Sequence, residues 1–380
     1  MKRAPKALLF LILLSTPLQG AETDTVMRDV YDAISYLLPL SIRDAGRQTP
    51  WDKELVDAKL DTLLAASAVL QEHAGNGDAE FRLLARSFDQ LVNSTAASFR
   101  QEWPDFAYYS LSEITDHCVA CHARLPSDSQ AFFAQRLLAR MDNDKLPAEA
   151  KALLLVATRQ FSEALTVLET LLLDPTMDPI EADYRGLTML YLRIGLSTSE
   201  KLTRVQRLVE RYLSRSDLPY YLEQRISHWA SALRRVQSIL DSQPGLEQAL
   251  TLYDEGGSAS PIAGNRQGAV EDLAAARLIR QHLAANPTAD KGLAASLYLK
   301  LAVLSLRTSD PGPAVPEMES LLVAAIESAP DSDTARKAYA LLEEYGFVHE
   351  EHLARQLESR VLIDMKQLKR AAGISVNAAH

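Results

Sequence analysis

Cysteine is scarce in this chain of 380 residues. It occurs only at Cys118 and Cys121, in the stretch EITDHCVACHARLP (113–126). Two cysteines three positions apart can close a disulfide, but so small a loop constrains little of the unfolded chain. A closed zinc site needs four ligands, and beyond His122 only His117 lies nearby, with no second CxxC or HxxxH pair. Neither covalent stabilisation nor structural zinc explains this spacing well.

Glycine and strand-like alternation are also sparse. The chain has 15 glycines and is 47% apolar, rich in leucine and alanine, which predicts an all-α fold. A thioredoxin-like redox pair needs a strand that feeds a helix N-terminus. Here the cysteines come late in a predicted helix and no strand precedes them, so this kind of redox site is disfavoured.

Long apolar runs are missing too. The run Ala7–Leu14 is too short to span a bilayer, and no other stretch is long enough. It follows Lys2, Arg3 and Lys6 and ends in small residues near Ala21, which is typical of a secretory signal peptide over residues 1–21. We therefore expect export to the periplasm of a Gram-negative bacterium, without a membrane span after cleavage. An uncleaved membrane anchor is the alternative.

The sequence CxxCH, formed by Cys118, Cys121 and His122, is the signature of covalent haem attachment. Residues i, i+3 and i+4 share one face of a helix, so both thiols can reach the vinyl groups of one porphyrin while the imidazole reaches its iron. The sequence thus predicts one haem c, bound through Cys118 and Cys121, with His122 as the proximal iron ligand. Export agrees with this, because bacteria attach c-type haem outside the cytoplasmic membrane.

Residues 22–128 are predicted to form four helices. Apolar residues recur at helical spacing, as in Val30 and Ile34 of the first helix and Phe88 and Leu91 of the third. The second begins near Asp52, which suits a helix start. Short connections between helices of this length predict an antiparallel four-helix bundle, with the cysteine motif near the end of the last helix.

With these features, residues 22–128 resemble the cytochrome c-prime family and its low-spin relatives. The resemblance implies that Cys118 and Cys121 bind haem and that His122 is the proximal ligand. In low-spin relatives a methionine near the start of helix one is the distal ligand, and Met27 stands there in this chain. A vacant distal site, apolar or lined by Tyr31, and a different ligand remain alternatives.

Residues 129–365 are predicted to form a second helical domain. The stretch QFSEALTVLETLLLDP (160–175) resembles the second helix of a tetratricopeptide repeat, and SDTARKAYALLEEYG (332–346) is of the same type. We therefore expect a TPR-like α-solenoid that binds a peptide or protein. An irregular helical bundle is the alternative. Residues 254–268, DEGGSASPIAGNRQG, are predicted to be a flexible connector, and residues 366–380 a loose tail. Prolines are predicted to separate the helices; they are Pro147, Pro175, Pro179, Pro219, Pro244, Pro287 and Pro330.

Negative charge is concentrated in the predicted haem domain. Residues 22–128 hold 9 Arg and Lys against 18 Asp and Glu, and the whole chain has a formal charge of −10. This sign disfavours nucleic acid as a partner. It favours either the steering of a basic redox partner toward the haem or simply the solubility of an exported protein.

Three functions are compatible with these features. The first is electron transfer by a periplasmic monohaem cytochrome with a helical docking scaffold. The second is a haem-based sensor or binding protein for NO or CO, which requires a vacant distal site. An enzyme is not expected, since no catalytic arrangement is recognised outside the haem motif, and a peroxidase-like activity would need an open iron and a distal base.

Overall fold

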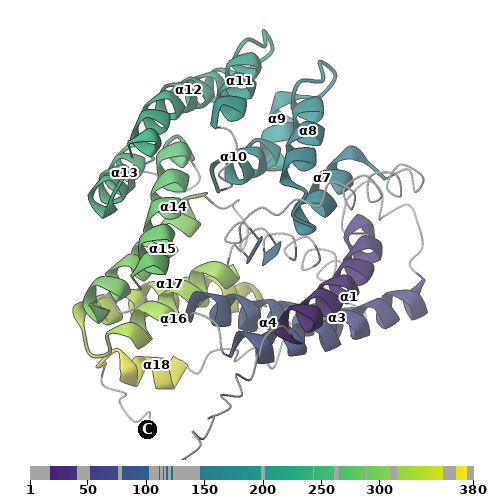
Figure 1. The fold of residues 1–380 in the computed structure, drawn as a ribbon, viewed down its shortest axis with the longest axis vertical. Coiled ribbons are helices and arrows are strands. Elements are labelled where there is room, and N and C mark those ends of the chain that lie inside the picture. Colours follow the sequence, from purple (N-terminus) through teal and green to yellow (C-terminus); the bar gives the residue numbers. More distant parts are fainter. Residues whose placement is uncertain are drawn as a thin grey trace, which may run out of the picture.

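Helices make up all the regular structure that the computed structural model of this chain describes (Figure 1). No strand occurs in that part of the chain, so the predicted all-α class is confirmed there. Most of the predicted signal peptide (1–17), Pro287 and the predicted boundary at residues 128 and 129 lie outside it. The described residues are 18–40, 52–75, 79–101, 111, 114, 117–118, 121–122, 146–197, 202–242, 244–260, 265–286, 290–308, 315–353 and 365–374.

In the described part of the chain, three helices precede the cysteine motif: α1 (Leu18–Leu40), α3 (Lys53–Ala74) and α4 (Ala79–Arg100). α3 packs against both α1 and α4. Val30, Ile34, Phe88 and Leu91 are buried, as their helical spacing predicts. The predicted start of the second helix is also confirmed, because the side chain of Asp52 accepts a hydrogen bond from the backbone N–H of Leu55 at 3.0 Å and caps α3.

Twelve further helices are described after the motif, and successive ones pack against each other, as in α7 with α8 and α15 with α16. Their bounds are α7 (Ala148–Ala157), α8 (Phe161–Leu172), α9 (Pro179–Tyr184), α10 (Leu187–Ser197), α11 (Leu202–Leu213), α12 (Tyr220–Asp241), α13 (Leu246–Ala259), α14 (Ala269–Ala285), α15 (Lys291–Thr308), α16 (Val315–Ser328), α17 (Asp333–Leu353) and α18 (Met365–Ala371).

The predicted proline breaks agree with these bounds wherever they can be compared. Pro147 and Pro219 stand directly before α7 and α12, and Pro179 is the first residue of α9. Proline suits the first turn of a helix because its missing N–H would have no intrahelical partner there. The helix predicted by its resemblance to a tetratricopeptide repeat exists as α8, with Phe161 and Ala164 buried.

An ionic network joins three of these helices. Arg204 of α11 donates to both carboxylate oxygens of Glu169 on α8, at 2.6 and 3.0 Å, and the hydroxyl of Tyr191 on α10 donates to the same carboxylate at 2.7 Å. Two parallel bonds between a guanidinium and a carboxylate fix orientation as well as distance. Helices α8, α10 and α11 are thereby held in register.

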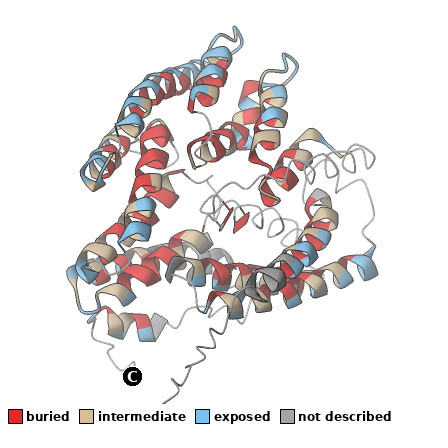
Figure 2. Ribbon diagram, in the orientation of Figure 1, coloured by how far each residue is buried: buried red, intermediate tan, exposed pale blue. Residues whose placement is uncertain are grey.

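Helices near both ends of the region after the motif contact the N-terminal helices. α7 contacts α1, and α16 packs against α4 although the two are more than 200 residues apart in sequence (Figure 1). Most of the buried apolar residues form one hydrophobic cluster that extends from Val26 to Ala372, and Figure 2 shows buried residues along helices before and after the motif. The predicted division into two domains stays a prediction, but the helices assigned to each pack on those of the other.

The first part of the predicted connector at residues 254–268 is helical instead. Residues 254–259 belong to α13, and Gly256 and Gly257 are packing residues of that helix. A Cβ atom on Gly256 would lie 2.2 Å from Oδ1 of Asp272, and one on Gly257 would lie 2.6 Å from the guanidinium of Arg307. The glycines permit close contact between helices. From the sequence alone, glycines in this role cannot be distinguished from glycines of a flexible loop.

The chain end differs from its prediction as well. The sequence predicts a loose tail from residue 366, but residues 365–371 form α18, which packs against α16 and α17. Leu368 is buried, and the N–H of Asp331 donates to the carbonyl of Ala371 at 2.9 Å. This backbone bond lies between segments 40 residues apart, so no local pattern reveals it.

Two adjacent carboxyl groups are buried near the start of α14. Glu271 accepts hydrogen bonds from His228 at 3.1 Å and Arg235 at 2.8 Å, and Asp272 accepts one from Arg307 at 3.2 Å. Burial raises the pKa of Asp272 to about 7, and the charge of Glu271 acts in the same direction, whereas Arg307 opposes the shift. The charged form of Asp272 is therefore disfavoured in the folded chain.

This shift makes stability depend on pH. Because the folded pKa of Asp272 exceeds the ordinary value of 3.8, its contribution to stability is present at low pH and is lost as pH rises from about 4 to about 7. Asp272→Asn should raise the melting temperature at pH 8 and flatten its dependence on pH over that range. Thermal unfolding followed by circular dichroism measures this.

Asp333→Asn is the matched control. The pKa of Asp333 is lowered by its hydrogen bond to Lys337, so its contribution is present above the ordinary pKa and lost toward acid pH. That variant should not be stabilised at pH 8. An unchanged pH profile in Asp272→Asn would contradict the assignment.

Candidate functional site

The cysteine motif is helical where the structure describes it, and its described residues lie on one helix face. Residues 111, 114, 117, 118, 121 and 122 are helical, and the intervals between them are those of one helix face. All are buried except Cys121, which is half-buried. Cys118, Cys121 and His122 thus share one inward-facing surface, together with the apolar side chains of Leu111 and Ile114.

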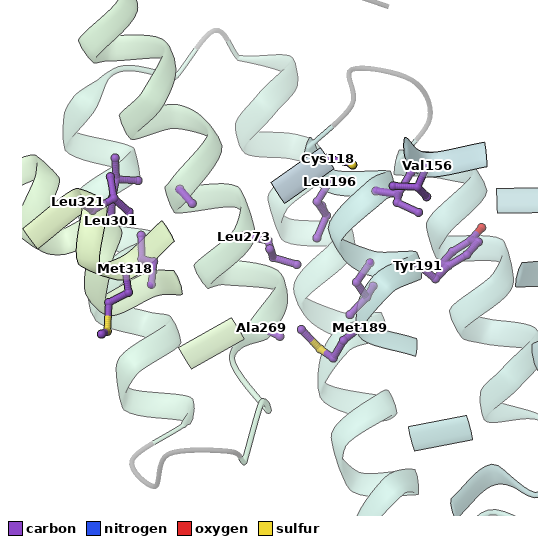
Figure 3. Packing of buried hydrophobic residues seen from close by; sticks show 14 of the residues in the cluster. Cys118, Val156, Met189, Tyr191, Leu196, Ala269, Leu273, Leu301, Met318 and Leu321 are labelled. Carbon is purple, nitrogen blue, oxygen red and sulfur yellow. The ribbon is translucent and has the colours of Figure 1, made fainter. Parts of the chain in front are cut away.

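The two thiols are present as cysteines and not as a disulfide. Cys118 belongs to the same hydrophobic cluster as Val156 of α7 and Leu196 of α10 (Figure 3). Both residues come from helices after the motif, and α7 borders the site, since the backbone carbonyls of Val156 and Ala157 act on His122.

His122 is buried with only 8% of its surface exposed. Burial, and to a smaller extent the positive charge of Arg159, lower its pKa to about 4, while the backbone carbonyls of Val156 and Ala157 act in the opposite direction. The imidazole is therefore neutral at neutral pH, which is the form that binds a metal. Among the described residues, its buried Nδ1 atom has no hydrogen-bond partner.

His117 stands on the same face but is held by α4. One of its ring nitrogens, Nε2, lies 3.1 Å from the hydroxyl of Ser87, and its ring centroid lies 6.1 Å from that of Phe88. Both partners are buried, so this contact anchors the motif helix to α4. No group of three or more His, Cys, Asp or Glu side chains in the described part of the chain is placed to hold a metal ion.

Met27 is half-buried on α1 and packs against the cluster that contains Cys118. Tyr31, one turn further along α1, does the same. Both predicted distal residues therefore contact the same core as the motif. The role of Met27 as a distal ligand stays a prediction, as does the vacant site that is its alternative.

The residues present fit a covalent haem. Two thiols and a neutral imidazole lie on one helix face, as the spacing requires, and their surroundings are apolar. The imidazole has a buried nitrogen without a hydrogen-bond partner among the described residues, which suits a group whose partner is added later. When bound, haem supplies an iron that changes its charge by one electron; the chain supplies the attachment points, the axial imidazole and a dry environment.

Sequence reasoning missed two residues around this site. Ser87 lies on α4, about 30 positions before the motif, and Arg159 follows α7. Neither belongs to a recognisable motif, and each reaches the site only through packing between helices. Nothing in the local sequence could have identified them.

Comparison with known protein families, with curated proteins and with solved structures gives no match for this chain. Within the described residues, no helix combines the length and the apolarity needed to cross a membrane.

Proposed function

We propose that this chain is an exported monohaem c-type cytochrome that transfers electrons in the periplasm. Cys118 and Cys121 bind the haem as thioethers, and His122 binds its iron. The observation that carries the proposal is the arrangement of these three residues on one buried helix face with the imidazole held neutral. The N-terminal signal-like sequence supports export.

Burial of the site favours electron transfer. A haem in an apolar environment exchanges an electron with little rearrangement of solvent, and burial and ligation together set its potential. Met27 lies on the face of α1 that packs against the hydrophobic cluster containing Cys118. An iron bound by both a methionine and a histidine has no open position for a gas. These features favour an electron carrier over a gas sensor.

The helical region offers a surface for a protein partner. Four of the five exposed large hydrophobic residues in the described chain lie at α9 and the start of α12: Ile180, Tyr184, Tyr220 and Tyr221. Exposed tyrosines are enriched at the energetic centres of protein interfaces.

That surface is rigid before any partner binds. Arg215 donates to the carbonyls of Leu172, Asp174 and Met177, and Arg225 binds Asp183 at 2.7 Å. The guanidinium groups of Arg215 and Arg225 are engaged in these contacts, whereas the carboxylates of Asp174 and Glu223 are exposed. Such a surface fits a basic protein, whose arginines and lysines can contact both tyrosine rings and carboxylates.

Haem attachment can be tested with the double variant Cys118→Ala and Cys121→Ala. The full chain is produced in a host that exports proteins and attaches c-type haem, then separated on a denaturing gel stained for haem peroxidase activity. We expect a stained band for the wild type and none for the variant, because only a thioether link survives denaturation. A stained variant would end the c-type interpretation.

Met27→Ala tests the distal ligand. If Met27 binds the iron, the oxidised wild type is low-spin and shows the weak long-wavelength band of sulfur–iron charge transfer. The variant should lose that band and bind CO, while Tyr31→Phe, one turn away, should keep it. A wild type that is high-spin and binds CO at once would exclude Met27 and favour the sensor function instead.

A further inference from the structure

A groove lies between α15 and α17, and Tyr253 of α13 lines it as well. Both α15 and α17 pack on α16 and contact each other. The groove has a cavity volume of about 520 Å³, and small-molecule sites typically measure about 300–1,000 Å³. It is therefore large enough to hold a small organic ligand.

Much of the groove wall is apolar. Leu299 and Val303 line it from α15, and Ala340 and Leu341 line it from α17. Ala340 is exposed and the other three are half-buried, so each still presents apolar surface to water. A ligand with an apolar body would be bound here by removing that surface from water.

One cation in the groove is held in place without a carboxylate partner. The Nζ atom of Lys300 lies 4.3 Å from the centroid of the Tyr253 ring, and the guanidinium carbon of Arg307 lies 4.7 Å from the same centroid. Arg307 also pairs with Asp272 at 3.2 Å, whereas within the described part of the chain no carboxylate pairs with Lys300. A ring attracts an ammonium group but accepts no ordinary hydrogen bond from it, so the donors of Lys300 are available to an anion.

A second lysine lines the groove from α17. Lys337 pairs with Asp333 at 2.9 Å, but these side chains are 68% and 70% exposed, and an exposed pair contributes little to stability. The Lys337 ammonium can therefore turn toward a ligand at small cost. Each lysine also has a hydroxyl one turn before it on the same wall, Ser296 on α15 and Thr334 on α17. Two ammonium groups and two hydroxyls can thus bind an anion.

A negative charge lines the groove further along α17. Glu344 stands seven positions after Lys337, which is about 10 Å in a helix that rises 1.5 Å per residue. A ligand with a carboxylate at both ends would bring one of them toward Glu344, and like charges repel. The groove therefore favours a single carboxylate on an apolar body of about that length.

We propose that the groove between α15 and α17 binds a small monocarboxylic acid with an apolar body. Its carboxylate contacts Lys300 and Lys337, and its body covers the apolar wall. The cavity volume and the grouping of the donors away from Glu344 favour a small molecule over a long peptide. This site needs no haem, so the inference is independent of the proposed function.

Isothermal titration calorimetry of the full chain with sodium octanoate tests this inference. We expect saturable binding at one site. Octanol lacks the charge, and octanedioate brings a second carboxylate toward Glu344, so each should bind at least about tenfold more weakly. The binding of octanoate should also weaken as the salt concentration rises, because salt screens the lysines.

Three variants locate the site. Lys300→Gln should weaken octanoate binding by about tenfold, because it removes a charged donor. Ala340→Trp should abolish binding, since a large side chain at this exposed position fills the groove without disturbing the core. Lys369→Gln is the matched control: Lys369 also lies over a tyrosine ring, that of Tyr339 at 6.0 Å, but outside the groove. Circular dichroism checks that each variant is folded.

Four results would contradict the inference. The first is the absence of saturable octanoate binding to the wild type. The second is octanol binding as tightly as octanoate, which would indicate general apolar adsorption. The third is wild-type binding by Ala340→Trp, which would place the octanoate elsewhere. The fourth is an equal loss of affinity in Lys369→Gln and Lys300→Gln, which would mean that overall charge controls binding.

Discussion

Burial of one helical face is the constraint on which the candidate site depends. A helix repeats its face every three to four residues, so a cysteine, a second cysteine three positions on and a histidine immediately after it must point the same way. In this chain that direction is inward, and Cys118 and His122 lie among apolar side chains. The same burial keeps the imidazole neutral and able to bind a metal. The proposed haem attachment and iron ligation would therefore both depend on one packing arrangement.

The chain surrounds this face with helices from distant parts of the sequence. α4 holds His117 through Ser87, α1 packs on the same cluster, and α7 ends beside His122. Because α16 also packs on α4, the region after the motif contacts the N-terminal helices at both of its ends. A change of oxidation state at a haem bound there would act on α7 directly.

Local features of the fold could be predicted from the sequence, and long-range ones could not. Apolar spacing located α1, α3 and α4, and prolines located many of the later helix boundaries, since both act within a few residues. The glycines of α13 were predicted to mark a flexible loop, but they allow close packing against Asp272 and Arg307. The sequence alone does not distinguish these two uses of glycine. α18 and Arg159 were missed because their partners lie far away in sequence. The cysteine spacing is the basis of the proposed haem chemistry, but it could not predict that α7 packs beside His122.

The proposed function requires one haem bound covalently at Cys118 and Cys121. Mass spectrometry of the intact, denatured protein tests it most directly, because non-covalent groups are lost on denaturation and thioether-linked haem is kept. We expect a mass equal to that of the polypeptide from residue 22 onward plus one haem. A protein purified from a haem-attaching host with the mass of the bare polypeptide would contradict it.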